Sequence, residues 1–296
     1  MLAKYFDEFM DLFNYPEEAK VVLKENFIKL TNSSDAYPVF LSFLETYKND
    51  SYCDVKSFHI AMKELSAKAD IHEYTGNLIL FICLSMYLKE HYAKAGISED
   101  IWFNSMCDLR YKLIECKEVH NIWGSFVPDW FVRFFKLDRF AFGKLQFEPV
   151  PFKANYKKGD IVLDENSIIL NVHIPRTGTK LDRESMNASY ADAAEFYKDK
   201  FKDSPVIFAC HSWLLFPKNK EILSETSNLY AFISDYDVFE TGEYEDYKEV
   251  WRLFDTHYDG NVDHLPQNTS FRKGYADWIR NNVKTGWGYG VYVYNK

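Results

Sequence analysis

The chain has 296 residues, of which 47% are hydrophobic and 18% aromatic, and its formal net charge is −9. This length can bury one large core or two smaller ones, and the apolar content argues against an intrinsically disordered chain. Acidic residues are spread along the sequence and no basic stripe is present, so we expect no nucleic-acid partner. The many rings, 25 Phe and 21 Tyr, predict a core of large side chains or an aromatic-lined cleft.

The cysteines are odd in number and form no Cys-x-x-Cys pair, which argues against a disulfide scaffold and against a zinc site. They are Cys53, Cys83, Cys107, Cys116 and Cys210. We therefore expect a reducing cytoplasmic location and no metal. The N-terminal residues 1–13 carry acids inside an apolar pattern, unlike a signal peptide. The most apolar stretch, 78–88, is about half the ~20 residues that span a bilayer, so we expect a buried helix and no membrane partner.

Residues 1–135 predict a helical domain. Apolar side chains recur with the 3.6-residue period of a helix, and Pro16, Ser34 and Ser98 are typical of helix starts. Segment 75–92 is apolar nearly all round, which predicts a helix at the centre of a bundle. The predicted helices are 2–13, a second from Pro16, a third from Ser34 to 47, then 55–69, 75–92, 98–119 and 128–135.

The pattern changes near residue 137, and residues 136–296 predict an α+β domain. Segment 139–150 predicts a strand with a possible bulge at Gly143. Residues 161–163 and 167–174 predict an antiparallel pair, and further strands are expected at 206–212 and 228–239. Thr269 or Ser270 is expected to cap a late helix, and the chain closes on a Gly-rich turn into a final strand.

The stretch 167–216 reads as an apolar strand, a short loop with Gly178, a helix and a second strand. A strand that ends just before a helix N-terminus presents unpaired backbone N–H groups, and such groups bind phosphates. Arg176, Lys180 and Arg183 supply local positive charge. Thr179 with Asp182, or Ser189 with Asp192, can form the capping box of this helix. An ordinary βαβ unit that binds nothing would show the same pattern.

A set of residues in the second half of the chain matches the pattern of a known family: His173-Ile174-Pro175, Gly178, Leu181, Glu184, Ser189-x-x-x-Ala193, Phe208-x-Cys210-x-Ser212-Trp213-Leu214-Leu215-x-Pro217, Ser227-Asn228 and Leu265-Pro266-x-x-Thr269-Ser270. Through these residues the second half resembles a GNAT-like C-terminal domain, and the whole chain is similar to the family that pairs it with a helical N-acyltransferase N-terminal domain. Residues 210–217 are the most specific part of this resemblance. The implied fold class is α+β: an N-terminal helical bundle, then a mixed, mostly antiparallel sheet flanked by helices.

The resemblance implies that acyl-CoA slots between two splayed strands and that its pyrophosphate rests on the loop before the helix. The expected acyl-CoA contacts are Ile174, Arg176, Thr177, Gly178, Thr179, Lys180 and Ser212. The superfamily's phosphate loop usually reads Q/R-x-x-G-x-G/A. Here Gly178 comes one position early, and no second Gly follows. Gly allows a backbone to approach phosphate closely.

Three side chains are candidates for proton transfer. His173 and His211 lie near the ends of the two strands, and an imidazole can take a proton from an attacking amine. Each can equally be a structural histidine. Tyr236 can protonate the departing thiolate. Cys210 and His211 cannot pair with each other, because adjacent strand residues point to opposite faces. An acidic run at 235–246 can be a solvated edge or can attract an amine.

The expected function is direct N-acyl transfer from acyl-CoA, with acetyl as the expected acyl group, to an amine of a small molecule. The alternative is a non-catalytic module that binds or senses CoA or another ligand while the helical domain contacts a partner. A weaker alternative is a hydrolase that uses Cys210 or Ser212.

Overall fold

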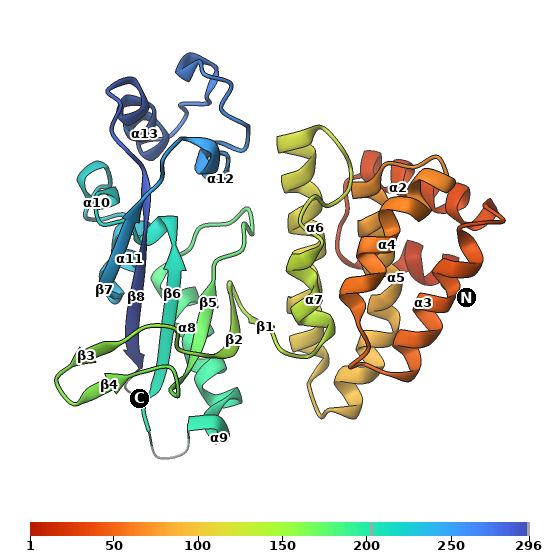
Figure 1. Ribbon diagram of the computed structural model, residues 1–296, viewed down its shortest axis with the longest axis horizontal. Coiled ribbons are helices and arrows are strands. Elements are labelled where there is room, and N and C mark those ends of the chain that lie inside the picture. Colours follow the sequence, from red (N-terminus) through yellow and green to blue (C-terminus); the bar gives the residue numbers. More distant parts are fainter. Residues whose placement is uncertain (202–203, 295–296) are drawn as a thin grey trace. The chain divides into compact units, whose positions relative to one another are not determined.

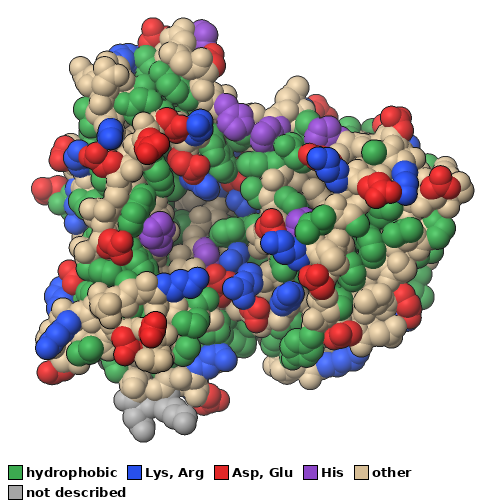
Figure 2. All heavy atoms as spheres, in the orientation of Figure 1, with side chains coloured by type: hydrophobic (Ala, Val, Ile, Leu, Met, Phe, Trp, Pro, Cys, Tyr) green, Lys and Arg blue, Asp and Glu red, His purple; other side chains and the backbone are tan. Residues whose placement is uncertain are grey.

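The computed structural model describes residues 1–201 and 204–294. The chain divides into two compact units, Met1–Ala141 and Phe142–Lys296, and each is described by itself. The domain boundary that we predict after residue 135 remains a prediction. Helix α7 (Asp129–Phe135) ends at that residue. Acidic and basic side chains are interspersed over the visible surface of both units (Figure 2), as the even spread of charge in the sequence leads us to expect.

The first unit is a bundle of helices around α5, whose residues 78–84 are fully buried (Figure 1). Phe81 of α5 packs against Phe131 and Phe135 of α7, with ring centroids 5.0 Å apart in both pairs. The central helix expected at 75–92 is therefore confirmed. The helices are α1 (Leu2–Leu12), α2 (Glu17–Asn32), α3 (Tyr37–Asn49), α4 (Val55–Lys68), α5 (Glu73–Lys94), α6 (Glu99–His120) and α7 (Asp129–Phe135).

The main sheet has the order β1-β2-β5-β6-β8-β7, and β5 and β6 are its parallel pair. The pairs β2–β5, β6–β8 and β7–β8 of this sheet are antiparallel. The mixed, mostly antiparallel sheet that we expected is therefore confirmed. The strands are β1 (Phe140–Phe142), β2 (Leu145–Pro151), β3 (Tyr156–Lys158), β4 (Ile161–Leu163), β5 (Ile168–His173), β6 (Val206–Ser212), β7 (Asp237–Glu243) and β8 (Gly286–Tyr294).

Helices and a hairpin cover the two faces of this sheet (Figure 1). On one face, Tyr190 of α8 packs against Phe147, Phe208 and Tyr292, with centroids 4.8–5.8 Å apart. On the other face, the β3–β4 hairpin and Phe152 cover one end of the strands. The remaining helical elements are α8 (Arg183–Phe196), α9 (Lys198–Phe201), η1 (Trp213–Leu215), α10 (Asn219–Ile222), α11 (Asn228–Asp235), η2 (Lys248–Val250), α12 (Trp251–Phe254), η3 (Val262–His264) and α13 (Ser270–Arg280).

Three expectations about strands are wrong in detail. Residues 139–150 form the two strands β1 and β2 with a turn at Gly143, not one bulged strand. Strand β4 pairs with β3, whereas β5 pairs with β2. Residues 228–235 are the helix α11, because Ser227 accepts a hydrogen bond from the Tyr230 N–H at 3.1 Å and so caps a helix N-terminus.

Candidate active site

Strands β5 and β6 pair only briefly. Their ladder consists of Leu170 with Phe208 and Asn171 with Ala209, yet β5 continues to His173 and β6 to Ser212. Among the described residues, no β5–β6 pair forms beyond Asn171 and Ala209, so the facing edges of both strands are unpaired with each other near their carboxyl ends. Such edges present backbone N–H and C=O groups to a ligand.

A pocket of about 390 Å³ lies beside the end of β5. The loop before α8 forms one wall, and the first residues of α11 form another. Six of the seven residues predicted to bind the cofactor line this pocket, and Ser212 is not among its lining residues. The lining residues are Lys144, Ile174, Pro175, Arg176, Thr177, Gly178, Thr179, Lys180, Leu181, Ser227, Asn228 and Leu229.

The cations around this pocket are largely engaged by protein groups. Arg176 donates to Asp255 Oδ2 at 2.9 Å, and Arg272 binds the same carboxylate oxygen. Lys144 donates to the Lys180 carbonyl and, at 3.0 Å, to Asp182 Oδ2. Lys180 is exposed, and its ammonium forms no ion pair among the residues that the structure describes. Lys180 is therefore a cation available to a phosphate.

Asp182 is the N-cap of α8, so both capping boxes expected from the sequence are wrong. Its carboxylate accepts from the Ser185 N–H and from the Ser185 hydroxyl, each at 2.9 Å. The Ser185 N–H and then the Lys144 ammonium hold the pKa of this carboxyl well below its usual value. A protein anion thus already occupies the first turn of α8. In the loop, the Thr177 N–H already donates to the Pro175 carbonyl at 3.0 Å and the Thr179 N–H to the Thr177 hydroxyl at 3.3 Å. The N–H of Gly178, whose φ is +75° and whose surroundings are open, is a donor that a phosphate can meet.

His173 is held by two polar side chains on the same face of the sheet. Its Nε2 lies 2.9 Å from Glu148 Oε1 and 3.1 Å from Asn171 Nδ2. Asn171 Nδ2 also donates to Glu148 Oε1, at 3.2 Å. The side chains of His173 and Glu148 are only 16% and 7% exposed. A carboxylate at this distance orients an imidazole and stabilises its protonated form.

His211 lies on the same sheet face as His173. In the parallel register Asn171 pairs with Ala209, and the residues two positions later, His173 and His211, keep that face. His211 is exposed, and its ring lies 4.4 Å from that of Trp287 and 5.6 Å from that of Tyr289. The structure thus places both candidate bases at the ends of neighbouring strands.

Tyr236 lies on the opposite face, in the core. Its hydroxyl is 2.7 Å from the hydroxyl of Tyr190, and burial raises the pKa of both phenols well above their usual value. Cys210 is buried on that face too, and burial raises the pKa of its thiol to about 12. Ser212 accepts from the Leu214 N–H at 3.2 Å and caps η1. The structure does not bring these three residues together with the pocket.

Several residues of this region were missed in the sequence: Lys144, Glu148, Asn171 and the pocket residues of α11. Glu148 and Asn171 carried a signal, because a polar side chain two positions from another polar one in a buried strand shares its face. Ser227 carried the signal of a helix N-cap.

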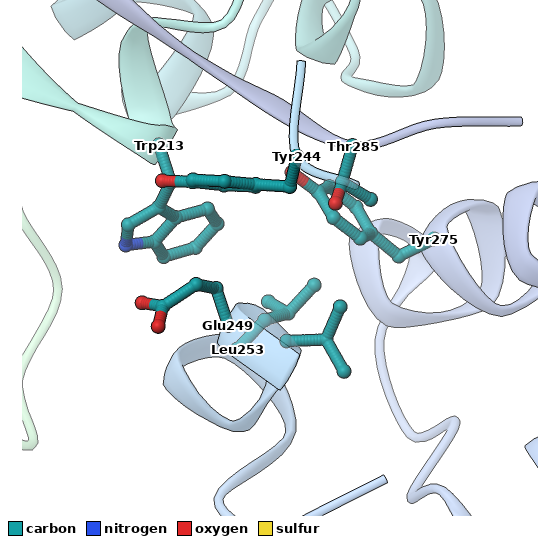
Figure 3. Close-up of a pocket in the computed structure, with 7 residues that line it drawn as sticks. Trp213, Tyr244, Glu249, Leu253, Tyr275 and Thr285 are labelled. Carbon is teal, nitrogen blue, oxygen red and sulfur yellow. The ribbon is translucent and has the colours of Figure 1, made fainter. Parts of the chain in front are cut away.

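A second, much smaller cavity lies among the residues that follow β6. It measures about 10 Å³ and is lined by Trp213, Tyr244, Glu249, Val250, Leu253, Tyr275 and Thr285. Figure 3 shows the rings of Trp213 and Tyr244 over Glu249 and Leu253. This volume is about that of one water. It belongs to an apolar cluster built mainly from α12 and α13, against which Ile174, Trp213 and Leu229 also pack.

Within residues 1–201 and 204–294, no group of three or more His, Cys, Asp or Glu side chains is arranged to hold a metal ion. None of the helices in these ranges has the length and apolar character needed to cross a bilayer. The five cysteines are free thiols.

Two family models match the chain: the N-acyltransferase N-terminal domain over residues 5–137 and the GNAT-like C-terminal domain over residues 140–292. A comparison with curated proteins gives no match. Similar solved structures include an acyltransferase in complex with decanoyl-CoA, with a TM-score of 0.74 and 17% identity over 97% of this chain and 87% of that chain. Another is an acyltransferase in complex with decanoyl-CoA and teicoplanin, with a TM-score of 0.73 and 16% identity over 97% of this chain and 86% of that chain. At such identities the likeness establishes the shared fold.

Proposed function

Because this chain belongs to the two-domain GNAT-like acyltransferases, in which an N-acyltransferase N-terminal domain precedes a GNAT-like C-terminal domain, we propose that it moves an acyl group from acyl-CoA to an amine by direct transfer. The observation that carries this proposal is the pocket beside the point where β5 and β6 cease to pair. In this proposal the CoA phosphates meet the loop N–H groups and Lys180, and the thioester lies between the two strand ends.

The reaction forms a C–N bond to the acyl group and breaks the C–S bond of the thioester. The neutral amine nitrogen attacks the thioester carbonyl, the C–S bond breaks, and the thiolate leaves. Backbone N–H groups on the unpaired edges of β5 and β6 can stabilise the oxyanion that forms. His173 accepts the proton of the amine at Nδ1. Its Nε2–H donates to Glu148 Oε1, 2.9 Å away, and this carboxylate stabilises the resulting imidazolium. The departing thiolate takes up the proton that His173 accepted, so the proton balance closes and the histidine is regenerated.

The acyl group that we propose is of medium length. An acetyl group was the sequence expectation, but two observations favour a longer chain. Ile174 and Trp213, at the ends of β5 and β6, pack against the apolar cluster of α12 and α13, and this surface can cover an alkyl chain. Similar acyltransferase structures contain decanoyl-CoA or octanoyl-CoA. The acceptor expected from the sequence is a small-molecule amine, and one similar structure contains teicoplanin.

A turnover assay tests this proposal. The protein is incubated with acetyl-, octanoyl- or decanoyl-CoA and an amine such as tyramine, while free CoA is followed by thiol titration and the amide by mass spectrometry. We expect amide formation with octanoyl- and decanoyl-CoA that exceeds formation with acetyl-CoA. A higher rate with acetyl-CoA would restore the original expectation. Tight binding of acyl-CoA without amide or thiol release, over a wider set of amines, would indicate the non-catalytic binding module instead.

A further inference from the structure

An aromatic and acidic surface lies on the sheet face that carries His173 and His211. In the register of β6, β8 and β7, His211 pairs with Tyr289, and Tyr289 pairs with Glu240. The β7 register shifts between Val238 and Glu240, but Glu240 lies two residues before Gly242, which pairs with Trp287, and so keeps the face of that pair. Residues directly opposite each other in antiparallel strands point to the same face. The Trp287 ring belongs to this row as well, since it lies two residues before Tyr289 and 4.4 Å from the ring of His211. We name these four residues the aromatic shelf.

The shape of the shelf follows from the glycines that alternate with its rings. A Cβ at Gly288 would lie 2.3 Å from the Leu215 carbonyl, so this position allows no side chain on the opposite face. The large side chains of this part of β8 therefore all emerge on the shelf side. A Cβ at Gly242 would lie 2.6 Å from the indole of Trp287. The indole therefore lies close against the backbone of β7 and forms a fixed, partly exposed surface.

The charge of the shelf comes from Glu240. Its neighbours on β7 already have cations: Asp237 lies 3.2 Å from the ammonium of Lys158, and Glu243 lies 3.1 Å from that of Lys218. Glu240 is exposed and forms no ion pair within residues 1–201 and 204–294. Burial and then the Glu240 carboxylate raise the pKa of the Tyr289 phenol to about 12. A cation beside these rings gains from both the carboxylate and the ring faces.

We infer that the aromatic shelf binds the acceptor, and that the acceptor is a primary amine that arrives as an ammonium ion on a ring-bearing body. The ring stacks on Trp287, and the ammonium lies between Glu240 and the ring faces. From there the amine is on the face of the sheet that holds His173, at the end of the neighbouring strands. The ammonium releases one proton to solvent before the reaction, and the neutral amine then attacks the thioester. This inference rests on the proposed function, because only an acyltransferase needs an acceptor here.

Binding of two matched probes tests the inference without acyl transfer. Tyramine carries the ring and the ammonium, whereas tyrosol carries the same ring with a hydroxyl in place of the amine. Their dissociation constants are measured by saturation-transfer NMR titration in the absence of CoA. We expect tyramine to bind roughly tenfold more tightly than tyrosol, as expected for one cation–π contact with a nearby carboxylate.

Variants assign this binding to the shelf. Trp287→Leu should weaken tyramine binding roughly tenfold, and Glu240→Gln should remove most of the difference between the probes. The controls are Trp251→Leu, which removes an indole already stacked with Arg252, and Glu221→Gln, which makes the same change of charge at an exposed site. Equal affinity of the wild type for both probes, absence of tyramine binding, or the same loss in the controls would overturn the inference. CoA titration into the shelf variants should be unchanged, so failure of acceptor binding is distinct from failure of the proposed acyl-CoA site.

Discussion

The two faces of the sheet at the ends of β5 and β6 differ in chemistry although the same strands supply both. On the α8 face, Cys210 and Tyr236 are buried, and burial holds both groups in their neutral forms. On the other face, His173 is paired with Glu148 and His211 is exposed. Because strand residues alternate, a shift of one position decides whether a titratable group serves packing or is available to a substrate.

The largest expected effect is a difference in activity between substitutions on the two faces of the sheet. His173→Gln should lower kcat/KM by ~10²-fold or more, the usual scale of general base catalysis, whereas Tyr236→Phe should leave it nearly unchanged. His173→Gln should also remove the acidic limb of the pH–rate profile, since that limb reports protonation of the imidazole. Rates are corrected for the folded fraction of each variant.

A matched control for this variant is His264→Gln, because His264 also contacts a carboxylate, Asp259, at 2.7 Å but is exposed in η3. It should keep the wild-type rate and pH profile. If His173→Gln lost stability but kept its rate per folded molecule, His173 would be a structural histidine. His211→Gln is then the next variant to measure, since His211 is the other candidate base.

The smaller expected effect concerns stability on the α8 face. Tyr190→Phe or Tyr236→Phe leaves one buried hydroxyl without its partner and should cost about 1–3 kcal/mol of unfolding free energy. The pH dependence has a definite sign. The folded-state pKa of each phenol lies above its unfolded value of about 10, so their contribution is present below that pH and is lost as the pH rises above it.

Urea unfolding at several pH values above 10 measures this loss. The wild type should lose stability more steeply with pH than either variant, each of which has one titrating phenol fewer. If the free energy of unfolding fell equally steeply with pH in the wild type and both variants, these phenols would ionise alike in the folded and unfolded states. That result would contradict their burial in the core.

Elements marked by a pattern within a few consecutive residues could be predicted from the sequence. The bounds of β6 and the Thr269 cap of α13 follow from apolar runs and a single capping residue. Pairing of β3 with β4 and of β2 with β5 was not predicted, because register depends on contacts far apart in the chain. The helix α11 was mistaken for a strand because its aromatic and β-branched residues favour strands, while its Ser227 cap decides the local structure.

The residues of the candidate site likewise fall into those predicted from local sequence and those that only the fold brings together. The loop 174–180 was predicted as a unit because its residues are contiguous, and the structure gathers them around one pocket. Glu148 lies 25 residues before His173 and meets it only through the β2–β5 ladder. Asp182 was not predicted as the cap of α8, because Thr179 and Ser189 offered competing local patterns. Neither pattern forms, and the Asp182 carboxylate accepts from the N–H and the hydroxyl of Ser185 instead.

The central claim is that the pocket beside β5 binds acyl-CoA, and calorimetric titration of decanoyl-CoA and CoA into the wild type and Gly178→Val tests it most directly. A β-branched residue at a φ of +75° is strained and crowds the loop N–H groups. Gly159→Val is the matched control, since Gly159 has a φ of +57° with open surroundings in the β3–β4 turn. We predict that the wild type and Gly159→Val bind both ligands, and that Gly178→Val, with circular dichroism of a folded protein, binds them at least ~10-fold more weakly, about 1.4 kcal/mol. Unchanged affinity in folded Gly178→Val, or no binding by the wild type, would contradict the claim.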